Sequence, residues 1–138
     1  MTSALNAALL YQARACEGLD SPFMGRLLRM LAAHWPTDTA LAAKCAAWQG
    51  DIGPLAASLP LRIAGGLHAL VLQNIDPDLT AAYPPNDATD SQLWAALDHA
   101  LHSQDAFLCN WIEHAPQTNE VRRAAVLIAA TQLLADRF

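Results

Sequence analysis

The stretch from residue 117 to residue 134, QTNEVRRAAVLIAATQLL, constrains the fold more than any other part of the chain. It begins with polar side chains and then carries no polar residue from Ala124 to Ala130. A helix of this composition must be buried on most of its circumference, because apolar side chains project from every side. Thr118 can cap its first turn, where the Glu120 carboxylate meets the positive end of the helix dipole. Something must therefore cover this helix.

The amino-acid composition is rich in apolar residues and poor in charge. Of 138 residues, 54% are hydrophobic and 15% are charged, whereas an average globular domain carries about 25% charged residues. A helical protein of this kind often buries part of its apolar surface against another partner. Lys and Arg number 8 against 13 Asp and Glu, which gives a net charge of −5. Without a basic stripe, this balance disfavours a nucleic-acid partner.

Cysteine usage and the apolar stretches indicate a cytoplasmic location. Cys16, Cys45 and Cys109 are far apart and form no Cys-x-x-Cys pair. We therefore expect small buried thiols in a reducing compartment, and neither a zinc ribbon nor a redox motif. No signal peptide is visible at the N-terminus. The most apolar run, residues 61–75, is too short to span a bilayer, so we expect no membrane partner.

Proline, glycine and capping residues divide the chain into helices. Apolar residues recur at helical spacing between these breaks, and no strand-like alternation runs longer than a few residues. The sequence therefore predicts an all-α fold without a sheet, as a single compact domain of about six helices over residues 1–138. The predicted helices span residues 3–17, 22–35, 38–48, 61–73, 89–113 and 117–134, with a short helical turn at 77–82.

Local chemistry predicts where the helices begin and end. Gly18 is a ready stop for the first helix, and Pro22 suits the first position of the second. Each N-cap side chain is expected to accept a hydrogen bond from a backbone N–H group of the first turn. The expected N-caps are Ser21 for the second helix, Thr37 or Asp38 for the third, and Thr89 or Asp90 for the fifth.

Two adjacent glycines, Gly65 and Gly66, lie inside the predicted helix 61–73. Each costs about 1 kcal/mol relative to alanine in a helix interior. The simplest compensation is the close approach of another helix, because a glycine presents no side chain at the contact.

Histidines are the candidates for a metal or catalytic site. Asp98 and His102, with His99 between them, have the i, i+4 spacing at which a helix presents two metal ligands. No third or fourth ligand is indicated, so we interpret them as a solvated polar face and predict no metal site. His68 is either a general base or a structural residue, which means a buried imidazole bonded to a backbone carbonyl or a ring where two helices pack. We favour the second interpretation because no nucleophile lies nearby in sequence, and we predict neither a catalytic residue nor a cofactor.

The densest group of hydrogen-bonding side chains precedes the apolar run of the last helix. It includes Thr118, Asn119, Glu120 and Arg123. In one interpretation these residues form a capped helix start with a Glu120–Arg123 ion pair, worth roughly a few tenths of a kcal/mol when exposed. In the other interpretation they contact a ligand or a neighbouring domain.

Four segments of the chain, taken in order, resemble a known family. They are Ser21-Pro22-Phe23 with Leu27-Leu28, Gly66-Leu67-His68-Ala69-Leu70-Val71-Leu72, Ala82-Tyr83-Pro84, and Gln117-Thr118-Asn119-Glu120 with Arg123. Together they resemble the N-terminal part of the bacterial family called domain of unknown function 2332. The polar fourth segment is the most specific, and the resemblance runs over nearly the whole chain.

The resemblance implies a helical half of a longer architecture. Members of that family look about twice as long or longer, and their second half resembles a methyltransferase-like α/β region. Residues 1–138 are then expected to form a helical accessory domain or lid that covers the site of that C-terminal half and does not catalyse alone. The expected ligand- or domain-contacting residues are Thr118, Asn119, Glu120, Arg123 and His68.

A second hypothesis stays open beside the accessory domain. The chain could be a non-enzymatic interaction module, or a homodimer that uses the apolar last helix as its interface. Its partner is then a second copy of the chain in place of a C-terminal α/β domain.

Overall fold

A computed structural model describes residues 3–48 and 59–114 of the chain. In this part the chain forms seven helices and no strand, which confirms the predicted all-α fold class. The predicted helix at 117–134 lies outside the described residues. The helices are α1 (Ser3–Gly18), α2 (Pro22–His34), α3 (Ala40–Ala46), α4 (Leu59–Leu72), α5 (Pro77–Ala82), α6 (Asp90–Ser103) and α7 (Asp105–His114).

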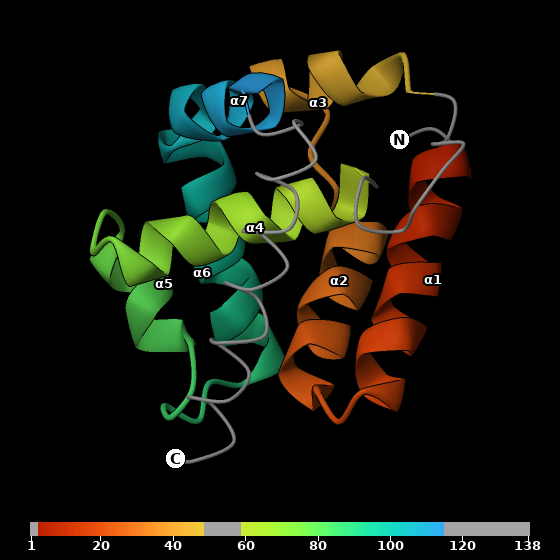
Figure 1. Ribbon diagram of the computed structural model, residues 1–138. Coiled ribbons are helices and arrows are strands. Elements are labelled where there is room, and N and C mark those ends of the chain that lie inside the picture. Colours follow the sequence, from red (N-terminus) through yellow and green to blue (C-terminus); the bar gives the residue numbers. More distant parts are fainter. Residues whose placement is uncertain (1–2, 49–58, 115–138) are drawn as a thin grey trace.

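α4 crosses the middle of the view in Figure 1. α1 and α2 stand side by side as a hairpin, and α4 contacts α1. α3 and α7 lie side by side at one end of the molecule and α5 contacts α6, while α4 also contacts both α5 and α7. None of the seven described helices combines the length and the apolarity that crossing a bilayer requires.

The sequence of α4 explains its central position. Leu59, Pro60 and every residue from Ile63 to Leu70 are buried. Because these residues point in all directions around the helix axis, α4 has no face that can be given to solvent. Its neighbours must therefore bring apolar or small side chains to it from several sides.

Gly66 lies where α7 reaches α4, and this confirms the predicted close approach of a second helix at this glycine. A Cβ atom placed on Gly66 would stand 3.0 Å from Leu108 Cδ2 and 3.2 Å from Trp111 Cδ1. Leu108 is buried, so it has little room to move away. The loss of helix propensity at Gly66 thus allows the side chains of α7 to lie directly on the α4 backbone.

The turn between α1 and α2 differs in detail from the prediction. Gly18 is the last residue of α1, but Asp20 adopts the left-handed conformation, with φ of 61°. The Ser21 N–H then donates to the Cys16 carbonyl at 2.9 Å and closes the end of α1. Ser21 holds the N-cap position of α2, as predicted, without a side-chain capping bond, and Pro22 takes the first helical position.

Two further N-caps were predicted, and the structure confirms one of them. Thr89 accepts from the Gln92 N–H, and the Gln92 side chain accepts from the Thr89 N–H, so α6 begins with a complete capping box. For α3, the prediction of Thr37 or Asp38 is wrong. Thr39 is the cap, and its hydroxyl accepts from the Ala42 N–H at 3.0 Å.

The predicted single helix over 89–113 is divided at Gln104, which adopts φ of −107° and ψ of 23°. The Asp105 carboxylate, at the first position of α7, accepts hydrogen bonds from the Ala40 and Leu41 N–H groups at 2.8 and 2.9 Å. These are unpaired donors at the start of α3. The chain changes direction at Gln104, and α7 lies beside α3.

We predict that Gly66→Val lowers the free energy of unfolding by about 1–3 kcal/mol, because the added methyl groups collide with Leu108 and Trp111. The matched control is Gly18→Val, where a Cβ atom meets nothing within 4 Å and the expected change is below about 0.5 kcal/mol. Urea unfolding followed by circular dichroism measures both. Equal effects at the two positions would contradict the close contact of α4 with α7.

Candidate functional site

Three of the four segments that carry the family resemblance meet in a cluster of rings, called the aromatic cluster below. Phe23 comes from the start of α2, His68 from α4, and Tyr83 from the end of α5. The Phe23 and Tyr83 rings meet edge to face with centroids 4.7 Å apart, and those of His68 and Tyr83 lie 5.4 Å apart. The fourth segment, with Thr118, Asn119, Glu120 and Arg123, lies outside the described residues.

His68 and Tyr83 form a buried hydrogen-bonded pair. The Tyr83 hydroxyl lies 3.1 Å from His68 Nδ1, and the imidazole is also hydrogen-bonded to the Ala64 carbonyl one turn earlier. His68 is 0% exposed and Tyr83 is 2% exposed. The other ring nitrogen, His68 Nε2, is buried without a hydrogen-bond partner in the described part of the chain. The carbonyl bond corresponds to the structural interpretation of His68.

Burial keeps both members of this pair uncharged near neutral pH. It lowers the pKa of His68 to about 4, although the hydrogen bond to the Ala64 carbonyl acts in the opposite direction. Burial also raises the pKa of Tyr83 well above its ordinary value. An imidazole with so low a pKa is a weak base at neutral pH. The pair is thus suited to holding α4 against the end of α5.

The three cysteines are buried free thiols, as predicted. Burial raises the pKa of Cys45 to about 12, and the neighbouring Cys109 acts in the same direction. Burial also raises the pKa of Cys16 and of Cys109. Since the thiolate is the nucleophile, such thiols are poor candidates for covalent catalysis.

The Asp98–His102 pair holds a linker to α6. His102 Nδ1 lies 2.7 Å from the Asp98 carbonyl oxygen, and His102 Nε2 lies 2.8 Å from Asp38 Oδ1, between α2 and α3. The Asp98 carbonyl and then the Asp38 carboxylate raise the pKa of His102. His99 is exposed. Within residues 3–48 and 59–114, no group of three His, Cys, Asp or Glu side chains is placed to hold a metal ion.

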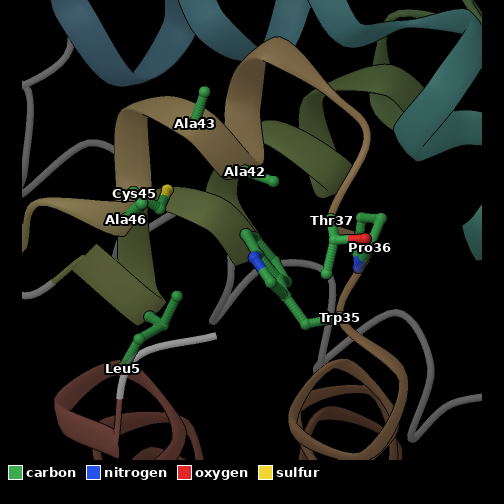
Figure 2. A pocket seen from close by; sticks show the side chains of 8 residues that line it. All are labelled: Leu5, Trp35, Pro36, Thr37, Ala42, Ala43, Cys45 and Ala46. Carbon is green, nitrogen blue, oxygen red and sulfur yellow. The ribbon is translucent and has the colours of Figure 1, made fainter.

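An apolar cavity of about 340 Å³ lies between the ends of α1 and α2 and the helix α3. Figure 2 shows the Trp35 ring below Ala42 of α3, with Leu5 of α1 to its left. Its lining also includes the Cys45 side chain, whose thiol stays protonated at neutral pH. The cavity therefore offers apolar surface and no charged group among its lining residues.

A second hollow, called the ion-pair groove below, has a volume of about 580 Å³. One stripe of α2 lines it, with charged residues toward the start of the helix and apolar and aromatic ones toward the end. The stripe is formed by Pro22, Arg26, Arg29, Met30, Ala33 and His34. Glu17 closes it at the end of α1, and Asp90, Ser91 and Trp94 line it from α6.

This groove was not predicted from the sequence. Its lining comes from three helices, and their contact depends on long-range ion pairs. The i, i+3 spacing of Arg26 and Arg29 was the one local signal available.

Comparison with known proteins gives one family. A family model described as "Uncharacterized protein conserved in bacteria (DUF2332)" matches residues 6–138. No curated protein and no solved structure matches the chain significantly. The matched range contains all the described helices except the first residues of α1.

We predict that the buried imidazole makes the protein less stable in mild acid. The unfolded chain protonates His68 near pH 6.5, whereas the folded protein does so only near pH 4. Unfolding therefore takes up a proton between these values, and the free energy of unfolding falls with falling pH by up to about 3 kcal/mol. Urea unfolding at several pH values measures the slope.

His68→Asn is the informative variant, because asparagine keeps a polar group near Nδ1 and does not titrate. We expect it to lose most of the acid-dependent slope. His102→Asn is the control, and we expect it to change the pH dependence of the free energy of unfolding in the opposite direction. The raised pKa of His102 stabilises the fold in its protonated state, and this contribution is lost as the pH rises. A slope unchanged by His68→Asn would contradict the burial of a neutral imidazole.

We also predict that Tyr83→Phe lowers the free energy of unfolding by about 0.5–1.5 kcal/mol, because it removes the hydrogen bond between the Tyr83 hydroxyl and His68 Nδ1 inside the core. The ring contact with Phe23 is retained. Tyr11→Phe serves as control, since Tyr11 is 51% exposed. Chemical denaturation compares the two, and a loss at Tyr83 no larger than at Tyr11 would contradict a structural hydrogen bond.

Proposed function

Because the chain belongs to the bacterial family DUF2332, we propose that it acts in the cytoplasm as a helical accessory domain. In this proposal the domain covers the site of a C-terminal methyltransferase-like α/β half and is not catalytic alone. The resemblance of the four segments supports the architecture. The chemistry of the described residues supports the accessory role.

One observation supports the proposal: the acid–base and nucleophilic groups of His68, the cysteines, Asp76 and Asp105 are buried, or they form hydrogen bonds that hold the helices together. His68 is enclosed and bonded to Tyr83. The thiols are buried with raised pKa values. Asp76 caps α5, and Asp105 binds the first amides of α3. A nucleophile beside a base, which covalent catalysis needs, is not among these arrangements.

The proposed contacts with the ligand or the α/β half are Thr118, Asn119, Glu120 and Arg123. They are the polar segment of the resemblance and offer hydroxyl, amide, carboxylate and guanidinium groups within one short stretch. His68 is the fifth predicted contact residue. Its imidazole is enclosed in the core, so a contact at Nε2 requires the helices around it to move apart.

The test uses a family member that carries both halves and titrates it with S-adenosylmethionine, the usual methyl donor. We predict that the double change corresponding to Asn119→Ala and Glu120→Ala weakens binding about tenfold or more, because charge-assisted hydrogen bonds at the covered site are lost. The control corresponds to Asn110→Ala, at an exposed position of α7. Calorimetry measures the affinities, and unchanged binding in the double variant would sink the proposal.

A non-enzymatic interaction or homodimerisation module is the second candidate. It is favoured by two large apolar side chains of the α1–α2 hairpin, Leu19 with 76% and Tyr11 with 51% of their surface exposed. Light scattering decides between one copy and two. A monomeric mass at high concentration would exclude the homodimer and leave the accessory domain untouched.

A further inference from the structure

We infer that the ion-pair groove is a binding site for a small molecule that carries a flat aromatic ring and one carboxylate. This site belongs to the helical domain itself and therefore goes beyond the proposed accessory role. Its volume of about 580 Å³ lies within the range of roughly 300–1,000 Å³ that small-molecule sites occupy. The groove has two arginines that are each paired with a carboxylate, and two aromatic rings lie at its other end.

The charges follow the order minus, plus, plus, minus across the groove. Arg26 pairs with Asp90 of α6 at 2.6 Å, and Arg29 pairs with Glu17 of α1 at 2.6 Å. In Figure 1, α2 lies between α1 and α6, and the two arginines of α2 pair with carboxylates on these flanking helices. Because Arg26 and Arg29 are three residues apart on one helix, their side chains begin at neighbouring positions, and we place the carboxylate of the ligand between them.

Both arginines keep donors for such a ligand. Arg26 donates from Nε to Asp90 Oδ1 and from Nη2 to the Ala88 carbonyl, each at 2.6 Å. Arg29 donates from Nε and Nη2 to the two oxygens of Glu17. A guanidinium has five N–H donors, and Nη1 takes no part in these bonds. The internal pairs also hold the guanidinium planes in place before a ligand arrives, which reduces the entropy lost on binding.

The flanking carboxylates select the charge of the ligand. Glu17 and Asp90 already compensate most of the positive charge, so a second negative charge on the ligand meets repulsion from both sides. A monocarboxylate suits this environment better than a phosphate dianion. A cationic ligand is disfavoured because it would be repelled by the two guanidinium groups.

The ring of the ligand fits the other end of the groove. The His34 and Trp94 rings lie there with centroids 4.9 Å apart, and Met30 is nearly buried beside them. Trp94 is partly exposed, so one part of its surface is available to a flat ring. Methionine sulfur also makes favourable contacts with aromatic rings. Ala33 is small and exposed, and it leaves room between the arginines and this end.

The experiment titrates the chain with 2-naphthoate and follows the backbone, Arg Nε–H and Trp indole N–H signals by NMR. We expect saturable binding with a dissociation constant below about 1 mM, with shifts at Arg26, Arg29 and Trp94. The matched amine, 2-naphthylmethylamine, and the dianion 2-naphthyl phosphate are each expected to bind about tenfold more weakly or worse.

Two variants test the geometry independently. Arg29→Gln is expected to weaken naphthoate binding about tenfold. Its control is Lys44→Gln, which removes a positive charge and an exposed ion pair on α3, outside the groove. Ala33→Trp fills the groove without removing a hydrogen bond and is expected to abolish binding. Failure of naphthoate to saturate by about 10 mM, equal binding of the amine or the phosphate, or full binding by Ala33→Trp would each overturn the inference. These readouts concern this chain alone, so they are independent of any α/β half.

Discussion

The burial of α4 from Ile63 to Leu70 is the constraint on which the rest of the described structure depends. A helix with no face for solvent can be stable only if neighbours cover it from several directions. α1, α5 and α7 each contact it, and α7 comes close because Gly66 offers backbone where another residue would offer a side chain. The break at Gln104 belongs to the same constraint. Only after the chain turns there can α7 lie on α4 and still reach α3 through Asp105.

Burying a histidine in this helix destabilises the fold, and the contacts of the aromatic cluster partly offset this loss of free energy. An unpartnered buried nitrogen destabilises a fold by about 1–3 kcal/mol, and His68 Nε2 has no partner among the residues that the structure describes. Its Nδ1 atom is bonded to Tyr83, whose ring meets Phe23 of α2. Apolar contacts tolerate small shifts of one helix along another, whereas a hydrogen bond of 3.1 Å permits one arrangement. The pair therefore contributes to the register of α2, α4 and α5 more than to their stability.

Local chemistry predicted those parts of the fold that depend on neighbours in sequence. Prolines and glycines bounded most of the helices, and Thr89 with Gln92 formed the expected cap. Predictions failed where a distant residue decides the outcome. Asp105 binds the first amides of α3, which places the cap at Thr39 and ends α6 early. The meeting of Phe23, His68 and Tyr83, and the groove between three helices, are equally long-range, and no local pattern encodes either of them.

The ion pairs of Arg26 with Asp90 and of Arg29 with Glu17 hold helices together and also line the proposed binding site. Arg29 holds Glu17 through two hydrogen bonds, and Arg26 joins α2 to the start of α6. In solvent such pairs contribute little to folding, because the charges are screened and the side chains lose freedom. A carboxylate that enters between them changes this balance, since it shares donors with Glu17 and Asp90 and excludes water. Occupation of the groove is therefore coupled to the α1–α2 and α2–α6 contacts, and an event at the surface can alter how firmly the helices around α4 are held.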